Sequence, residues 1–216
     1  MNHNMTFFGE TLLFIGAHPD DIELGCGALI AEVDGRANVV CVTLSDNQEN
    51  PELTTLVAEH QESMAILGVK PENDILRQFT TRRFQASRQE ILEEMLALKK
   101  TYHPEVVFVH TSQDIHQDHK TVTEEALRAF RGTTVLGFDV LRSSYGFFPN
   151  FLVDVSEQSV QTKIKALKAY KTYQDRYYFN ESILHATAIR HGALAERPYA
   201  EGFDILRIVG EFGHER

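Results

Sequence analysis

The sequence contains no tryptophan, only two cysteines and no long apolar run. Cys26 and Cys41 are too few for a disulfide framework or a cysteine-rich metal site, and their apolar surroundings indicate buried, reduced thiols. No segment reaches the length of about 20 apolar residues that crosses a bilayer. The first ten residues, MNHNMTFFGE, lack the basic start and apolar centre of a signal peptide. We therefore expect a cytoplasmic protein.

Basic residues are also scarce, with 21 lysines and arginines against 31 acidic residues and a formal net charge of -10. No basic run could follow a phosphate backbone, which argues against a nucleic acid as partner. With 216 residues, 43% hydrophobic and 24% charged, the composition is typical of a globular protein. We find no repeat or linker, so we expect a single domain over residues 1–216.

Apolar runs alternate with helical patterns along the chain. Strands are predicted over residues 11–17, 37–44, 74–76, 105–110, 135–138, 151–155 and 203–209. Helices are predicted over residues 19–34, 53–67, 87–102, 120–130, 157–173 and 181–195. This alternation predicts an α/β fold with a Rossmann-like parallel sheet, helices on both faces, and C-terminal strands and helices that extend or cap the sheet.

The first candidate site is the segment A-H-P-D-D, residues 17–21, where the first predicted strand meets the first predicted helix. Ligands of open parallel sheets bind at the carboxyl ends of the strands, where the strand order reverses. A simpler interpretation also exists, because carboxylates in the first turn of a helix are favoured by the free N–H groups there. Taken alone, the segment does not decide between the two.

The second candidate site is D-I-H-Q-D-H, residues 114–119, which follows the strand ending at His110. Its histidines could equally be surface residues at a helix start. If the sheet has the usual order, however, the two strands are neighbours at the switch point and both segments open into one crevice. The simpler interpretations do not explain why both clusters follow apolar strands, so we favour one shared site.

The residue types in these segments suit a metal ion. Zinc prefers imidazole nitrogen and carboxylate oxygen, and a catalytic site has three protein ligands and one open position. His18, Asp21 and His119 supply such a set. Zinc makes hydroxide available near neutral pH, and amide hydrolysis also needs a general base and a proton donor. Asp20 and His116 remain for these tasks.

With these segments the sequence resembles the PIG-L/LmbE family of zinc-dependent N-deacetylases. The resemblance is carried by AHPDD with the following IELGCGALI, and by HQDH. It extends to FLVDVS at residues 151–156 and YAEGF at residues 199–203. It implies a Rossmann-like fold and hydrolysis of an N-acetyl group from an N-acetylglucosamine-like sugar or a related small conjugate.

Carried over by position, the resemblance makes His18, Asp21 and His119 the zinc ligands. It makes Asp20 the general base, His116 the residue that stabilises the oxyanion or protonates the amine, and Asp118 the carboxylate that orients His116. The expected partner is therefore a small N-acetylated sugar or conjugate. Fe²⁺ or Co²⁺ in place of Zn²⁺ stays open, as does a homo-oligomer.

Two departures concern the substrate pocket. The family often shows T-D-G-E after its second strand, where this chain has Leu44-Ser45-Asp46-Asn47-Gln48-Glu49. The family also often carries a substrate-binding arginine three residues before the glutamate of its next helix. Glu59 stands there in this sequence. Both departures spare the metal ligands and leave the substrate open.

Other functions remain as alternatives. A deacylase could act on another N-acylated molecule, such as an aminocyclitol or an antibiotic precursor. A nucleotide-binding module is disfavoured because no G-x-G-x-x-G follows the first strand, and a non-catalytic metal-binding scaffold is disfavoured by the spare Asp20 and His116. Arg82 and Arg83 could bind an anionic part of a substrate or lie in a solvated loop. The aromatic residues 173–179 could stack on a sugar, although packing is the simpler role, and His110 is interpreted as structural or surface-exposed.

Overall fold

The computed structural model describes residues 9–47, 50 and 52–210. Its strands are β1 (Thr11–Gly16), β2 (Asn38–Thr43), β3 (Asp74–Leu76), β4 (Val106–His110), β5 (Thr134–Phe138), β6 (Phe151–Asp154) and β7 (Ala200–Arg207). Its helices are α1 (Asp21–Val33), α2 (Leu56–Ile66), α3 (Arg88–Tyr102), α4 (Gln117–Ala129), α5 (Glu157–Leu167) and α6 (Glu181–Leu194). Short 3₁₀ helices cover Pro71–Asn73, Phe84–Ser87, Lys171–Tyr173 and Tyr177–Phe179. Most of the N-terminal segment MNHNMTFFGE, together with Gln48 and Glu49, lies outside the described residues.

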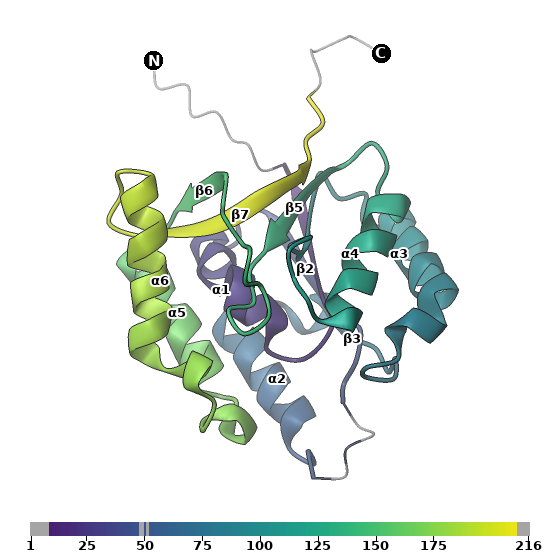
Figure 1. Cartoon of the computed structure of the whole chain (residues 1–216), viewed down its shortest axis with the longest axis horizontal. Coiled ribbons are helices and arrows are strands. Elements are labelled where there is room, and N and C mark those ends of the chain that lie inside the picture. Colours follow the sequence, from purple (N-terminus) through teal and green to yellow (C-terminus); the bar gives the residue numbers. More distant parts are fainter. Residues whose placement is uncertain (1–8, 48–49, 51, 211–216) are drawn as a thin grey trace.

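The strands form one sheet in the order β3-β2-β1-β4-β5-β7-β6. The first five are parallel, whereas β7 runs antiparallel to both β5 and β6. The predicted α/β fold is therefore confirmed as a mixed seven-stranded sheet, in which the C-terminal strands extend one edge. Figure 1 shows β7 crossing beside β5 at that edge.

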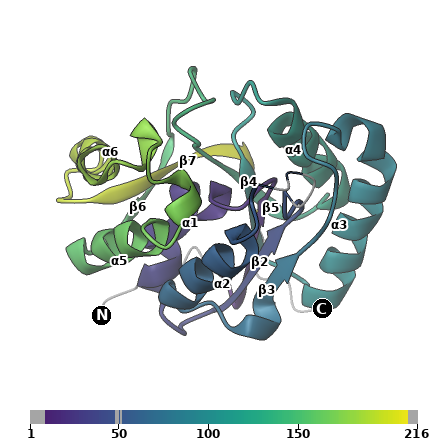
Figure 2. The same cartoon turned by 90° about the horizontal axis from the view of Figure 1, so that it is seen from below.

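Helices cover both faces of the sheet, as Figure 2 shows. Successive residues of β1 explain this arrangement. Leu12 and Phe14 belong to the core cluster shared with α1, α2, α5 and α6, whereas Leu13 and Ile15 belong to the cluster shared with α3 and α4. All four side chains are fully buried. Both faces of β1 are therefore covered by helices, which explains why its sequence is an uninterrupted apolar run.

Several predicted boundaries were wrong, among them the start of α2, which begins at Leu56 and not at residue 53. The helix predicted over residues 157–173 ends at Leu167, and the chain then turns so that the Tyr170 hydroxyl donates to Glu23 Oε1 over 2.5 Å. The last strand begins at Ala200 and not at Phe203, because residues 200–203 pair with β6. Helix α4 begins at Gln117, three residues earlier than predicted. A local pattern does not reveal such tertiary contacts.

Two sequence-based expectations concern the helices: that no phosphate-binding glycine turn follows the first strand, and that no segment crosses a membrane. Gly25 lies inside α1 against Phe138, where an added methyl group would lie within 2.8 Å of three ring and side-chain carbons. Its role is therefore close packing of α1 on β5, not a phosphate-binding turn. Within the described part of the chain, no helix has the length and apolar character needed to cross a membrane.

Candidate metal centre

The loop after β1 places three of the candidate residues. The strand ends at Gly16, and α1 begins at Asp21. The backbone N–H of His18 donates to Asp21 Oδ2 over 2.8 Å, which closes the loop on itself. Asp20 has a φ of 97°, in the left-handed region. Such a conformation at a non-glycine residue costs about 1–3 kcal/mol and is typical of functional sites.

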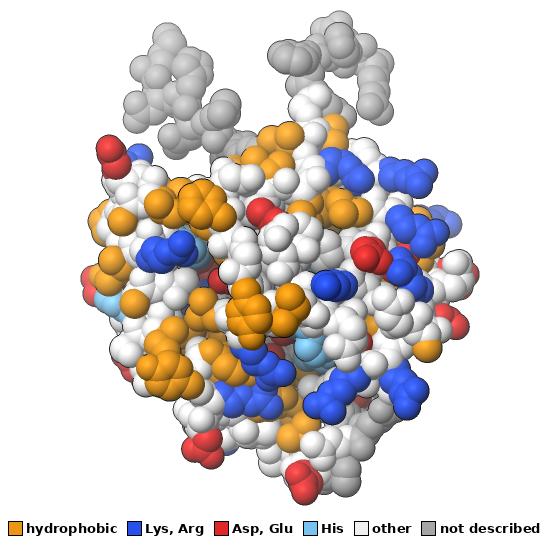
Figure 3. Space-filling view, in the orientation of Figure 1, with side chains coloured by type: hydrophobic (Ala, Val, Ile, Leu, Met, Phe, Trp, Pro, Cys, Tyr) orange, Lys and Arg blue, Asp and Glu red, His pale blue; other side chains and the backbone are white. Residues whose placement is uncertain are grey.

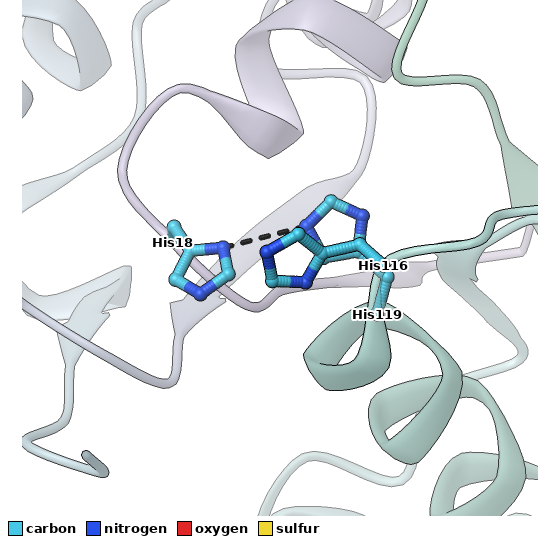
Figure 4. Close-up of side chains that lie close together, drawn as sticks. All are labelled: His18, His116 and His119. Atoms are coloured by element: carbon cyan, nitrogen blue, oxygen red, sulfur yellow. Dashed lines mark hydrogen bonds between the residues drawn. The ribbon is translucent and has the colours of Figure 1, made fainter. Parts of the chain in front are cut away.

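The start of α4 places the other candidates. His116 caps the helix, because its Nδ1 accepts a hydrogen bond of 3.2 Å from the backbone N–H of Asp118. His119 lies in the first turn, directed at the loop after β1. Strands β1 and β4 are neighbours in the sheet, so the two predicted segments meet at its carboxyl edge. Figure 4 shows His18 facing His116 and His119 across this edge.

The three predicted ligand atoms form a nearly equilateral triangle. His18 Nδ1 lies 3.3 Å from His119 Nε2, and each of these nitrogens lies 3.4 Å from Asp21 Oδ2. Atoms that bind a tetrahedral zinc at about 2.0–2.2 Å lie about 3.3–3.6 Å from one another. The three side chains therefore fit one divalent cation, and all three line the cavity described below.

Carboxylates hold both imidazoles in the tautomer that metal binding needs. His18 Nε2 donates to Asp118 Oδ2 over 3.0 Å, and His119 Nδ1 donates to Asp114 Oδ2 over 2.8 Å. When a cation binds, the other nitrogen of each ring, which belongs to the triangle, would give up any proton it carries and supply a lone pair. Carboxylate–histidine pairs of this kind orient metal ligands and raise their basicity.

The electrostatics of the centre favour positive charge. Burial alone would lower the pKa of His18, but hydrogen bonds to Asp118 and Asp21 raise it to about 9. Burial would raise the pKa of Asp21, but His119 and the hydrogen bond with the His18 side chain hold that pKa well below its usual range. Asp21 is therefore ionised at neutral pH, as a ligand must be.

Replacing Asp114 by asparagine is expected to weaken binding of Zn²⁺ by about 10- to 100-fold. The Asp114 carboxylate accepts hydrogen bonds from the His119 ring, the His116 backbone N–H and the hydroxyls of Ser143 and Ser144. An amide would turn its NH₂ group toward one of these donors. Competition with a chelator of known affinity measures the effect.

A matched control exists for this substitution. Asp74 makes a similar pair with a buried histidine away from the centre, since His60 Nε2 lies 3.0 Å from Asp74 Oδ1. Asp74→Asn should leave zinc affinity unchanged. Equal affinities of wild-type protein and the Asp114→Asn variant would show that Asp114 does not support His119.

His116 lies beside the triangle, and its ring differs from those of the ligand histidines in protonation and hydrogen bonding. Burial and the nearby His119 lower its pKa to about 4, so that the ring is neutral at pH 7. Because its Nδ1 accepts from the backbone, its proton is on Nε2. One ring nitrogen of His116 also lies within 4.8 Å of ring nitrogens of His18 and His119. With Nδ1 already occupied, His116 suits hydrogen-bond donation to a substrate better than metal binding.

His110, interpreted from the sequence as structural or surface-exposed, is buried beneath the centre. Its ring stacks on that of His119 with 3.8 Å between centroids, and its Nε2 accepts from the Ala17 backbone N–H over 3.1 Å. Burial and His119 lower its pKa to about 3. His110 thus links the two segments as a neutral support. Its place at the carboxyl end of β4 was the available signal.

Asp118 contacts a different histidine from the one that the resemblance implies. Its carboxylate accepts from the His18 ring and from the backbone N–H groups of Arg82 and Phe84. Only its backbone N–H contacts the His116 ring. In this structure Asp118 therefore orients His18 and ties the loop after β3 to the centre.

A cavity of about 480 Å³ opens beside the centre. Its lining residues are His18, Asp20, Asp21, Asn47, Asn50, Leu53, Thr81, Arg82, His116, His119, Val140, Arg142, Ser143, Tyr173, Arg176 and Tyr178. Asp20, the predicted base, is buried and lines it. Small-molecule sites commonly have volumes of about 300–1,000 Å³. The cavity can hold a sugar or a similarly sized conjugate.

The structure separates residues that the sequence grouped together. Arg82 and Arg83 are both exposed, but Arg82 lines the cavity and Arg83 does not. Tyr173 and Phe179 both belong to the core, with Tyr178 packed against it, but only Tyr173 and Tyr178 also line the cavity. Glu59 lies elsewhere, where its Oε2 accepts from the Thr172 backbone N–H over 3.2 Å. Arg142 and Arg176 were not predicted, because they come from loops without a recognisable motif.

Comparisons with known proteins agree with the fold. The chain is 29% identical over 170 residues to the uncharacterized deacetylase YaiS of Escherichia coli, covering 74% of this chain and 90% of that one. The N,N'-diacetylchitobiose deacetylase of Pyrococcus horikoshii superposes with a TM-score of 0.76 at 22% identity, covering 91% and 84% of the two chains. GalB, the 4-carboxy-2-hydroxymuconate hydratase of Pseudomonas putida, superposes with a TM-score of 0.75 at 17% identity, covering 95% and 100%. At these identities the two structures show a shared fold.

A family model covers more than half of the chain and both segments of the centre. Residues 13–130 match the model of PIG-L, described as GlcNAc-PI de-N-acetylase. The matched region runs from β1 through α4, and therefore includes His18, Asp21 and His119. The chain belongs to the PIG-L family.

Proposed function

We propose that this protein hydrolyses the N-acyl amide, most simply an N-acetyl group, of an amino sugar or a related small conjugate. In this proposal His18, Asp21 and His119 hold zinc or another divalent cation. The observation that carries it is the triangle of ligand atoms, with edges of 3.3, 3.4 and 3.4 Å, contributed by residues that line the cavity. Membership of the PIG-L family and the deacetylase YaiS as a relative support the reaction class.

A divalent cation, when bound there, supplies positive charge that polarises a carbonyl and acidifies water. The protein's own side chains supply the proton transfers. Asp20 lies next to the ligand Asp21 and lines the same cavity. Burial and the charge of Asp21 raise its pKa well above the usual range, which suits a group that exchanges protons near neutral pH. Asp20 takes the proton of the attacking water and passes it toward the departing amine.

His116 completes the arrangement as a neutral donor. Its Nε2–H is free of the backbone contact that occupies Nδ1. A donor at the edge of the cavity stabilises the negative charge that develops on the carbonyl oxygen when water adds to the amide. Asp118 and Asp114 act as positioning residues, because they contact the ligand histidines. The products are a carboxylate and a free amine.

The test is acyl release by the metal-loaded protein. We expect about one zinc equivalent per chain by elemental analysis, and release of acetate from at least one of N-acetylglucosamine, its phosphate esters and N,N'-diacetylchitobiose. Removal of the metal by dialysis against dipicolinate should lower the rate by at least about 100-fold, and added Zn²⁺ should restore it. A zinc-saturated chelator serves as the control. Full activity in metal-free protein would contradict the proposal.

A further inference from the structure

Three arginine side chains line the cavity beside the candidate metal centre: Arg82, Arg142 and Arg176. They come from the loops after β3, β5 and α5, which are remote in the sequence. The acidic lining residues are Asp20 and Asp21, which the proposed function assigns to proton transfer and to the cation. The cavity is therefore rich in positive charge in a chain of net charge -10. Figure 3 shows lysine or arginine side chains gathered near a histidine on one face.

Aromatic residues fix two of these guanidinium groups. Arg176 lies over the Tyr173 ring, with 3.8 Å from Cζ to the ring centroid, and its Nη1 donates to Tyr178 Oη over 2.6 Å. Arg142 Nη1 donates to the same oxygen over 3.4 Å. Two positive groups thus converge on one phenol. Stacked arginines keep their N–H edges available for a planar or tetrahedral anion.

Within the described part of the chain these three arginines form no ion pair, although Asp20 and Asp21 line the same cavity. Elsewhere arginines pair with carboxylates, in Arg36–Glu32, Arg77–Glu94, Arg88–Glu124, Arg88–Glu125, Arg128–Glu125 and Arg197–Asp154. Among the described residues, no carboxylate forms such a pair with Arg82, Arg142 or Arg176. Like charges gathered without ion-pair partners repel one another, and a bound anion lowers that cost.

The arginine group lies close to the reacting centre. Arg176 and Asp20, the proposed base, line the same cavity. The backbone N–H of Arg82 donates to Asp118 Oδ2 over 2.5 Å, and Asp118 in turn contacts the His18 ring. A substrate held by these arginines therefore has its anionic group within the span of a small molecule from the metal ligands.

We propose that the natural substrate carries a phosphate or carboxylate group beside its N-acyl amide, and that Arg142 and Arg176, with Arg82, bind this group. The inference rests on the proposed function, since it names the substrate class of the same site. Guanidinium forks match both kinds of anion and form charge-assisted hydrogen bonds with them. The arginines then act as specificity residues that select anionic over neutral substrates.

Kinetics with matched substrates test this directly. N-acetylglucosamine 6-phosphate and 1-phosphate present phosphate, N-acetylmuramic acid presents carboxylate, and N-acetylglucosamine is neutral. We expect kcat/KM of the best anionic substrate to exceed that of the neutral one by at least about 10-fold. Arg142→Gln and Arg176→Gln should each lower the ratio of kcat/KM for the anionic substrate to kcat/KM for the neutral one by about 10- to 100-fold. Equal losses for both substrates, or a preference for the neutral one, would overturn the inference.

Controls separate charge from folding. Arg83→Gln removes the same charge beside Arg82 but outside the cavity, so both substrates should react as with the wild-type protein. Arg176→Lys retains positive charge and should preserve part of the preference. If the glutamine variants fail to fold, the effect of added salt on kcat/KM of the wild-type protein still tests the inference. Added salt should lower kcat/KM for the anionic substrate and spare the neutral one, and equal salt effects would count against an anion site.

A binding measurement distinguishes failure of this inference from failure of the proposed function. If no substrate releases an acyl group, the proposed function is contradicted. Calorimetric titration of the zinc-loaded protein with glucosamine 6-phosphate and with glucosamine then tests the anion site independently of any reaction. Tighter binding of the phosphate, weakened at least about 10-fold by Arg142→Gln or Arg176→Gln, supports the anion site. Equal affinities, or no binding of either compound, overturn it.

Discussion

Replacing Asp20 by asparagine is expected to lower kcat by about 10²- to 10⁴-fold while the bound metal stays in place. The carboxylate is the proposed base, whereas an amide cannot accept a proton from water. Asparagine tolerates the left-handed backbone that Asp20 adopts, with φ of 97°, so the loop should keep its shape. Initial rates at saturating substrate and elemental analysis of the same sample measure both quantities.

The exposed Asp175 on the loop after α5 offers a control of the same chemistry, and Asp175→Asn should retain full activity. A rate for Asp20→Asn within about 3-fold of wild type would remove Asp20 from the role of base. Loss of the metal in Asp20→Asn would indicate that its carboxylate binds the cation, and would contradict the proposed division of roles between Asp20 and Asp21.

Replacing His119 by glutamine is expected to abolish metal binding and to lower kcat/KM by at least about 10³-fold. His119 Nε2 is a corner of the triangle, and His119 also belongs to both groups of side chains that could hold an ion. Without it, His18 and Asp21 keep only two ligand atoms. Zinc content after gel filtration and the rate with added Zn²⁺ measure the loss.

His185 provides the matched control for this substitution. It lies on α6, away from the centre, and packs against Tyr199 with 5.3 Å between ring centroids. His185→Gln should bind one zinc and remain active. A His119→Gln protein that retains one tightly bound zinc and wild-type activity would show that the centre lies elsewhere.

Most of the fold follows from local sequence patterns. The apolar runs at β1, β2 and β4 predict strands buried on both faces, and the spacing between them leaves room only for crossover helices. These patterns suffice to predict that residues 17–21 meet residues 114–119 at one edge of the sheet. The antiparallel direction of β7 could not be predicted, since an apolar strand carries no sign of the direction of its neighbour.

The supporting residues of the site were harder to predict. Asp114 and His110 act through His119, and nothing in their spacing distinguishes such contacts from surface exposure. Arg142 and Arg176 approach the cavity only because the chain turns after β5 and after α5. Residues that bind a metal recur at fixed spacing, whereas residues that select a substrate come from loops whose course depends on tertiary packing.

The fold alone does not select the reaction. GalB, described as a hydratase, has this fold at 17% identity, as does the diacetylchitobiose deacetylase at 22%. Function has to be argued from the site. In this chain the proposed reaction depends on the geometry shared by the loop after β1 and the first turn of α4, and on Asp20 beside it.

The most direct test is an anomalous diffraction measurement at the zinc absorption edge on crystals grown with Zn²⁺. We predict one strong peak within about 2.0–2.2 Å of His18 Nδ1, Asp21 Oδ2 and His119 Nε2. A peak coordinated by His18, His116 and His119 with Asp21 outside its shell would contradict the assigned ligands. The absence of any peak between the two segments, in crystals that bind zinc elsewhere, would contradict the metal centre itself.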